Sequence, residues 1–233
     1  MAARKLTILI LLCCGSVLCL FLFWRHIWFF RNPERHAPTG QNLVSPADGH
    51  VVYVKRLKPY EDIIVIKQGV SASVEDIVRE DVQEEKILIG IFMSPFDVHY
   101  NRSPLAGKID FIKHHPPECK NLHMGLMHLR TVLGWAPFYK ESLHIIKNER
   151  KVTRISGLFR GQEISVYVVQ IAAKNVNGID SYKSEDDVLE KGDIFGMIRI
   201  GSQVDLIVPA FESMTVKVEP GDRVRAGETI LID

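Results

Sequence analysis

The sequence has 233 residues, of which 46% are hydrophobic and 24% are charged, and its formal net charge is +1. This length suits one domain, or one domain with an attachment device. The balance of 29 Lys and Arg against 28 Asp and Glu argues against a nucleic-acid-binding protein with a broad basic face. The ordinary Gly and Pro contents exclude collagen-like and disordered chains.

The four cysteines are too few for a disulfide scaffold of this size. Cys13, Cys14 and Cys19 lie in one apolar run, and only Cys119 lies outside it. The absence of a CxxC pair argues against a structural zinc site and a thioredoxin-like motif. Free thiols fit a reducing compartment.

The first element expected along the chain is a membrane helix. Leu6–Phe23 contains 18 residues without a charge, and a bilayer core of roughly 30 Å is crossed by about 20 helical residues. The aromatic residues between 24 and 30 are typical of an interfacial belt. A cleaved signal peptide is the alternative, but the run is long for one and no A-x-A-like site follows it. We therefore predict a membrane anchor over residues 1–31.

The charges that flank this helix bear on its orientation. Arg4 and Lys5 precede it, whereas Arg25, Arg31 and Arg35 follow. Since cytoplasmic flanks carry the excess of Lys and Arg, the following domain is predicted to lie on the cytoplasmic side of the cell membrane.

Residues 45–233, after a linker over 32–44, form a strand-rich domain in this interpretation. Gly and Pro separate short runs that are dense in β-branched and aromatic residues. These runs are Val51–Val54, Ile63–Ile66, Ile87–Phe92, Ile109–Ile112, Ile164–Ile171 and Val204–Val208. They predict a mostly β (α+β) fold, a hairpin-built sandwich or barrel-like hybrid domain behind the N-terminal transmembrane helix. One helix is predicted at Val74–Glu80, with Ser73 as its N-cap.

The domain also contains an internal sequence similarity that suggests a pseudo-repeat. Ser45–Val51 resembles Ser103–Ile109, and Val188–Gly196 resembles Val218–Gly227. The second pair is similar to the turns of biotinyl and lipoyl domains. Glu212–Thr215 has no lysine where such a carrier holds its modified one, so a swinging-arm carrier is not favoured.

Three polar residues on separate turns are candidates for chemistry. Ser202 follows Gly201 between two strand patterns, Asp48 lies in a Pro-Ala-Asp-Gly turn, and His99 lies close to Arg102. Asp, His and Ser are the parts of a relay that activates a nucleophile. Each also has a simpler interpretation, because Gly-Ser and Asp-Gly are common turns and a lone histidine is often structural.

The arrangement of these motifs resembles the phosphatidylserine decarboxylase proenzymes of the short, membrane-associated type. The resemblance runs in order from about residue 30 to residue 209. It is carried by Phe30–Arg35, Ser45–Gly49, Phe92–Pro104, Asn148–Arg150 and Gly196–Pro209.

The resemblance implies a proenzyme that cleaves itself between Gly201 and Ser202. Ser202 Oγ would attack the Gly201 carbonyl, and elimination and hydrolysis would leave a covalent pyruvoyl group derived from Ser202. The products would be an upstream chain, 1–201, and a downstream chain of 32 residues.

The pyruvoyl ketone would then form a Schiff base with the serine head group of a membrane phospholipid and accept the electrons left by CO2. The product would be the ethanolamine lipid of phospholipid biosynthesis. The resemblance implies no metal and no diffusible cofactor. The charge balance predicts no nucleic-acid partner, and a homodimer stays open.

The resemblance also suggests roles for single residues. Asp48 and His99 are the candidate acid and base groups, and Arg102 is suited to bind the substrate carboxylate or phosphate. Two departures from the family pattern affect how far these roles apply to this chain. Arg102 stands where longer relatives carry a second histidine, and Gln203 stands where Ser or Thr is usual.

Two rival interpretations remain at this point. One is a non-enzymatic membrane-anchored adaptor with a lipoyl-like hybrid domain, and the other is a relative that folds without processing. Gly201-Ser202 separates them from the enzyme, because an adaptor has no reason to break its chain there. A metal site is not favoured, since no Cys, Asp or Glu at ligand spacing joins the histidines between residues 114 and 128. These histidines are His114, His115, His123 and His128.

Overall fold

The structure is a computed structural model, and it describes nearly the whole chain. The described residues are 2–59, 61–66, 70–73, 84–117, 119–139, 142–174, 176, 178–199 and 201–233. The helix predicted at Val74–Glu80 lies outside them. Met1–Pro33 and Glu34–Asp233 form two compact units.

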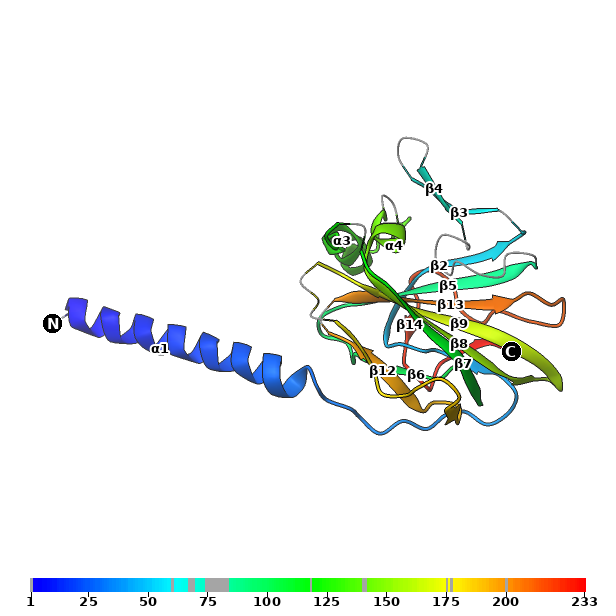
Figure 1. Cartoon of the computed structure of the whole chain (residues 1–233). Coiled ribbons are helices and arrows are strands. Elements are labelled where there is room, and N and C mark those ends of the chain that lie inside the picture. Colours follow the sequence, from blue (N-terminus) through cyan, green and yellow to red (C-terminus); the bar gives the residue numbers. More distant parts are fainter. Residues whose placement is uncertain are drawn as a thin grey trace. The chain divides into compact units, whose positions relative to one another are not determined.

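The first unit is the predicted apolar helix. Helix α1 spans Ala2–Phe23 and continues into a π-helical turn, η1, over Trp24–Trp28 (Figure 1). Together Arg4–Trp28 make 25 residues with a hydropathy of 2.8, which is long and apolar enough to cross a membrane. The side chains of residues 4–23 are exposed within this unit.

The second unit is built mainly of antiparallel strands. They are β1 (Leu43–Val44), β2 (Gly49–Leu57), β3 (Asp62–Ile66), β4 (Val70–Ser73), β5 (Lys86–Met93), β6 (Tyr100–Arg102), β7 (Gly107–His115), β8 (Arg150–Phe159), β9 (Gln162–Ala172), β10 (Ile179–Ser181), β11 (Val188–Leu189), β12 (Ile194–Ile198), β13 (Ser202–Pro209), β14 (Arg223–Val224) and β15 (Ile230–Ile232). The helices among its described residues are α3 (Gly125–Leu133) and α4 (His144–Lys147). The predicted mostly β class is confirmed.

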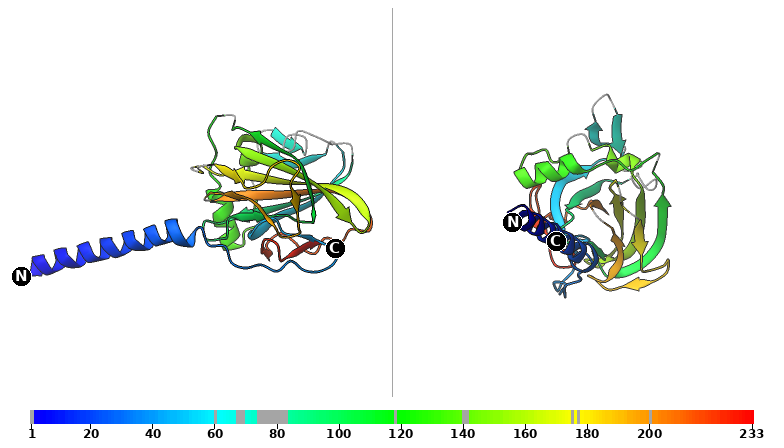
Figure 2. Two further views of the ribbon diagram at one scale, coloured as in Figure 1. Left: turned by 60° about the horizontal axis from the view of Figure 1, so that its bottom comes forward. Right: turned by 90° about the vertical axis from the view of Figure 1, so that its left-hand side faces the viewer.

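One large sheet determines the architecture. Its eight strands follow the order β11-β7-β8-β9-β13-β5-β2-β14, and the sheet curls strongly, with α3 and α4 on its outer side (Figure 2). Smaller sheets have the orders β10-β12-β6, β1-β15 and β3-β4. The β12–β6 pairing brings the segment that follows His99 beside the strand that precedes Gly201.

The sheet has a buried core on each face. In β5, Ile89 and Ile91 pack into the cluster inside the curl, whereas Leu88 and Phe92 pack into a second cluster with Met127 of α3. This division follows from the strand itself, because successive side chains point to opposite faces. Both faces of the central strands are therefore apolar, and a polar side chain there needs a hydrogen-bonding partner.

The sequence similarity between Ser45–Val51 and Ser103–Ile109 corresponds to two similar turns. Ser45 Oγ donates to the Ala47 carbonyl over 2.7 Å, and Ser103 Oγ donates to the Leu105 carbonyl over 2.6 Å. At the position of Asp48 the second turn carries Ala106. The turn itself therefore forms without an aspartate.

Each of these turns leads into a long strand through a glycine. Gly49 begins β2 and Gly107 begins β7. A Cβ on Gly49 would collide with the Phe92 carbonyl, and one on Gly107 would collide with the Ser156 carbonyl. The absence of a side chain lets the neighbouring strands approach.

We expect Gly49→Ala to destabilise the domain far more than Gly161→Ala. Both glycines have positive φ, +152° and +78°, but a Cβ at Gly161 meets nothing within 4 Å. Strain alone at Gly161 is worth about 1 kcal/mol, whereas Gly49→Ala also forces the backbone apart. Thermal unfolding of the two variants measures the difference, and equal losses would contradict the close approach.

Candidate active site

Ser202 is the first residue of β13, in the middle of the large sheet. It pairs with Met93 of β5 on one side and Ala172 of β9 on the other. Its side chain is fully buried, and Oγ donates to the Met93 sulfur over 3.3 Å. Gly201, just before it, has a φ of +57°, and a Cβ there would meet nothing within 4 Å. Glycine is thus favoured at 201 by its backbone conformation and not by lack of space.

Asn101 joins the surroundings of Ser202 to the turn that carries Asp48. Its Nδ2 lies 3.8 Å from the Met93 sulfur and 3.4 Å from the Pro46 carbonyl oxygen. Its Oδ1 accepts a hydrogen bond from Gln170 Nε2 over 2.7 Å. The three sequence segments with candidate residues therefore converge around one buried amide.

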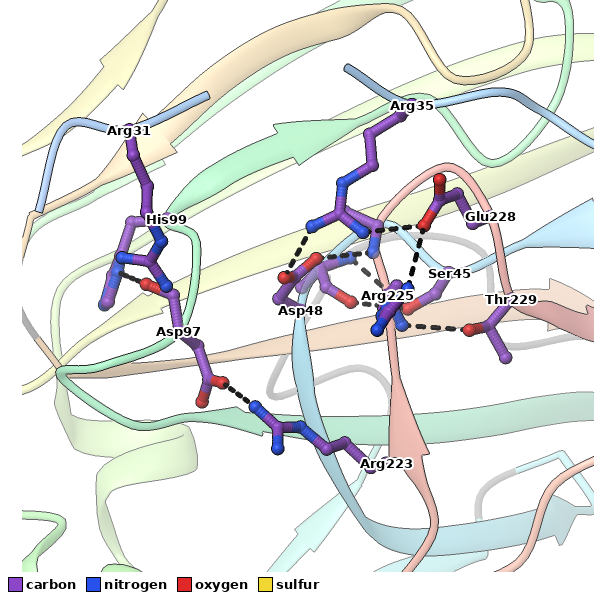
Figure 3. Close-up of polar contacts among 12 residues, drawn as sticks. Arg31, Arg35, Ser45, Asp48, Asp97, His99, Arg223, Arg225, Glu228 and Thr229 are labelled. Carbon is purple, nitrogen blue, oxygen red and sulfur yellow. Dashed lines mark hydrogen bonds and ion pairs between the residues drawn. The ribbon is translucent and has the colours of Figure 1, made fainter. Parts of the chain in front are cut away.

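His99 is fully buried at the start of β6. Its Nδ1 lies 2.9 Å from the Asp97 carbonyl oxygen (Figure 3). A carbonyl only accepts, so Nδ1 carries a proton, and in the uncharged form of the ring the lone pair would lie on Nε2. The His99 carbonyl accepts a hydrogen bond from Ile198 N over 3.3 Å, which fixes His99 beside the end of β12.

Asp48 is held in a buried ion pair with Arg35. Arg35 Nη2 lies 2.8 Å from Asp48 Oδ2 and Nη1 lies 2.7 Å from Glu228 Oε2, so the guanidinium bridges two carboxylates (Figure 3). Asp48 Oδ1 accepts from Ala226 N over 2.7 Å. Burial raises the pKa of Asp48, while the Ala226 N–H and the Arg35 charge oppose that rise. The hydroxyl of Ser202 meets the Met93 sulfur and not Asp48 or His99.

Arg102 lies on the far side of the same turn. Its backbone N donates to the Pro46 carbonyl over 2.9 Å, and its Nη1 donates to the Gly192 carbonyl over 2.8 Å. Burial lowers the pKa of Arg102, as does the nearby Arg35, whereas Asp48 raises it. Arg102 is therefore close enough to the Arg35–Asp48 pair to interact with it electrostatically.

Asp97 is a buried charge to which sequence reasoning assigned no role. Its Oδ2 accepts from Ser94 N over 2.8 Å, and its Oδ1 lies 3.5 Å from Arg223 Nη2. The signal that points to it is the Ser-Pro-Phe-Asp run, since a carboxylate three residues along caps such a turn. Its backbone orients His99, so the turn and the imidazole form one unit.

Gln203, directly after Ser202, belongs to a buried polar network on the opposite face of β13. Gln203 Oε1 accepts from His144 Nε2 over 3.0 Å, and Gln203 Nε2 donates to the Tyr53 hydroxyl over 2.6 Å and to Asp205 Oδ1 over 2.7 Å. The Tyr53 hydroxyl donates to Asp205 Oδ2 over 2.8 Å. The residue after the Gly201-Ser202 bond is thus fixed by partners from β2, α4 and β13.

Burial shifts the two titratable ends of this network in opposite directions. It raises the pKa of Asp205 to about 7, against the hydrogen bonds from Gln203 and Tyr53. It lowers the pKa of His144 to about 4. At neutral pH the imidazole is therefore uncharged, and the carboxyl is close to its midpoint.

Gly201 borders a cavity of about 210 Å³ between α3 and the sheet. Its lining is Phe92, Pro95, His123, Met124, Gly125, His128, Ala173, Lys174 and Gly201. A second cavity of about 260 Å³ shares Phe92 and His128 with the first. Of the two residues that the peptide bond between 201 and 202 joins, Gly201 therefore borders a cavity, whereas Ser202 is closely packed.

Comparison with known proteins identifies the family of the chain. The phosphatidylserine decarboxylase family matches residues 22–232. The chain belongs to that family. A phosphatidylserine decarboxylase proenzyme of Syntrophus aciditrophicus is 33% identical over 208 residues, covering 88% of this chain and 77% of the relative. The proenzyme of the same name in Amoebophilus asiaticus is 34% identical over 209 residues, covering 88% and 73%.

A third relative shows that the family resemblance extends to archaeal proteins. A protein of Methanocaldococcus jannaschii, provisionally named an archaetidylserine decarboxylase proenzyme, is 36% identical over 219 residues, covering 93% of this chain and 92% of the relative. The predicted family is confirmed, and the protein is a decarboxylase. The adaptor interpretation is excluded by this membership.

We expect Asp205→Asn to change how stability depends on pH. The folded-state pKa of Asp205, about 7, lies above its ordinary 3.8, so the native state keeps a proton that the unfolded chain releases. The free energy of unfolding of the wild type therefore falls as pH rises between those two values. Asp205→Asn removes this dependence, because the amide does not titrate. Between about pH 5 and pH 7, the free energy of unfolding of the variant should rise on the order of 1–2 kcal/mol relative to that of the wild type.

His144→Gln is the matched control with the opposite sign. The pKa of His144 falls from 6.5 to about 4 on folding, so the unfolded chain binds a proton that the native state does not. The free energy of unfolding that depends on His144 therefore rises as pH rises through that range. Unfolding midpoints of both variants at several pH values provide the measurement. Parallel curves for Asp205→Asn and the wild type would show that the carboxyl does not titrate as described.

Proposed function

We propose that the chain is a proenzyme that cleaves itself between Gly201 and Ser202 and then decarboxylates a phosphoserine lipid through a pyruvoyl group derived from Ser202. Family membership supports the reaction class. The observation that carries the cleavage is the arrangement at the bond, where a positive-φ glycine beside a cavity precedes a buried serine fixed between two strands. The phosphatidylserine named in the relatives and the archaetidylserine named in one share the phosphoserine head group.

Cleavage begins when Ser202 Oγ attacks the Gly201 carbonyl carbon. The C–N bond breaks, an ester forms, and the Ser202 nitrogen becomes an amine. Removal of the Ser202 Cα proton then breaks the Cβ–O bond, and Gly201 leaves as a carboxylate. Water hydrolyses the remaining dehydroalanine, ammonia is released, and a pyruvoyl group is left at the start of the downstream chain. The sheet pairing of Ser202 with β5 and β9 keeps this new end in register.

His99 and Asp48 are the proposed acid and base groups. The Nδ1–H bond to the Asp97 carbonyl keeps Nε2 of His99 in the form that accepts a proton. Asp48, fixed by Arg35 and Ala226, lies on the turn that Asn101 ties to the Met93–Ser202 contact. We assign to this pair the proton transfers at Ser202 during cleavage and at the pyruvoyl site during turnover.

The site fits the pyruvoyl group, because the bond faces a cavity on the Gly201 side and close packing on the other. When present, the group supplies an electrophilic ketone that binds the substrate amine and accepts the electrons released with CO2. Arg102, as a guanidinium, is suited to hold the substrate carboxylate or phosphate. We further propose that α1 anchors this domain at the cytoplasmic face of the cell membrane, since Arg25, Arg31 and Arg35 follow the helix.

Intact-mass measurement of the purified full-length chain, beside Ser202→Ala, tests self-cleavage. We expect the wild type to give a 32-residue fragment without a free amino terminus and the variant to stay at 26.5 kDa. A single uncleaved chain in both samples would refute the proposal and favour the relative that folds without processing.

Arg102→Gln separates substrate binding from processing. If Arg102 binds the lipid head group, the variant should cleave normally but raise the KM for the lipid about tenfold or more, with a smaller effect on kcat. His99→Gln should instead abolish cleavage. Mass spectrometry and release of CO2 from the lipid give both readouts, and loss of cleavage in Arg102→Gln would assign Arg102 to processing.

A further inference from the structure

An apolar surface on α3 is the least expected feature of the second unit. Among the described residues from 34 onward, six of the ten exposed large hydrophobic side chains fall within residues 122–135. We call them the α3 surface: Leu122, Leu126, Leu129, Val132, Leu133 and Trp135. Leu126 and Trp135 are each 60% exposed and Val132 is 68% exposed. A concentration of this kind on one short segment marks an interaction site.

The sequence of α3 explains why this surface cannot be turned inward. Met124 and Met127 already pack against the sheet in the second core cluster. Leu126, Leu129 and Leu133 follow one another at helical spacing on the other side and stay exposed. A helix of a soluble domain needs only one apolar stripe, so the second stripe of α3 has no task within the domain.

The charges around α3 indicate what covers this surface. From residue 119 to residue 139 the chain carries Lys120 and Arg130 but no Asp or Glu, and the first acidic residues on either side are Glu118 and Glu141. An exposed apolar segment that carries cations and no acidic residue of its own is complementary to a bilayer that contains anionic lipids. The same chain carries a helix that is long and apolar enough to cross a membrane, and the proposed anchoring by this helix would keep a bilayer within reach of the domain.

The segment that carries the α3 surface also borders the cavities beside the candidate active site. Met124, Gly125 and His128 of this segment line the cavity that Gly201 borders. Val132 lines the neighbouring cavity together with Phe96, which is 65% exposed. Insertion of this surface into a lipid layer would place the entrance of both cavities at the level of the head groups.

We propose that the α3 surface is a second membrane contact, which docks on a bilayer containing anionic phospholipids and brings the Gly201 cavity to the lipid head groups. The docking stands on the exposed residues and their charges alone. Only its consequence, that the cavity takes its substrate directly from the bilayer, rests on the proposed function.

Fluorescence of Trp135 tests the docking in the full-length chain. Trp24→Phe and Trp28→Phe leave Trp135 as the single tryptophan. The protein is reconstituted in vesicles of phosphatidylcholine and phosphatidylglycerol with brominated acyl chains, which quench tryptophan only inside the lipid. We expect strong quenching of Trp135. The matched control is Leu158→Trp with Trp135→Phe. Leu158 is 66% exposed and lies one residue before the end of β8, and the β8–β9 hairpin extends away from α3 in Figure 1. The tryptophan at position 158 should therefore not be quenched.

Leu126→Asn with Leu129→Asn then removes two exposed leucines from the α3 surface. We expect the quenching of Trp135 to fall and the turnover of lipid in vesicles to drop about tenfold. Turnover of a short-chain, water-soluble lipid and self-cleavage should not change. Leu158→Asn, the matched surface variant, should behave as the wild type in all of these assays.

The outcomes separate docking from the proposed function. Absence of quenching at Trp135, or equal quenching at position 158, overturns the docking whatever the activity. If a second copy of the chain covers the surface instead, Trp135 emission will depend on protein concentration and not on bromine, which also overturns it. Quenching in a protein that neither cleaves nor releases CO2 would support the docking while refuting the proposed function.

Discussion

The burial of β13 on both of its faces is the constraint on which the candidate site depends. The strand runs between β5 and β9, so side chains that alternate along it enter two different cores. Ser202 points into the curl and meets the Met93 sulfur, whereas Gln203 points outward and meets His144 of α4. Because polar groups in such places are costly without partners, both residues are held in a single position. The backbone between them is fixed from two sides, and Gly201, with its positive φ, takes up the change of direction at the strand's beginning.

The second constraint is the charge placed on the Ser45–Gly49 turn. Its pseudo-equivalent turn carries Ala106 where this one carries Asp48, and both keep the same serine hydrogen bond. The aspartate is therefore not needed for the turn, yet it is buried and costs desolvation energy unless it is compensated. Arg35 and the Ala226 N–H provide that compensation. A charge retained at such a cost, next to the Asn101 bridge, supports the role proposed for Asp48.

Local sequence predicted those parts of the fold whose signal is local. The long runs such as Ile87–Phe92 and Ile164–Ile171 are strands because β-branched residues fill both faces of a central strand. β8 was missed because its buried and half-exposed positions mix Lys, Arg and Ser with Val and Ile, and α3 was missed because its apolar residues surround the helix. The Ser202, His99 and Asp48 segments could be named from motifs. Their junction through Asn101, the Arg35 bridge and the Gln203 network could not, because each joins segments that are distant along the chain.

An anchor and a second membrane contact would solve different physical problems. A single helix joined by a linker raises the concentration of the domain at the bilayer, but a flexible tether does not select which face the domain turns toward the lipid. Substrate extraction needs that selection, because a lipid with two acyl chains leaves the bilayer only at great cost for each buried CH2 group. An apolar helix at the rim of the cavity supplies the orientation and shortens the path of the head group. In this proposal the exposed stripe of α3 is a functional counterpart of α1, and its cost in solubility would be offset if α1 keeps the domain at the membrane surface.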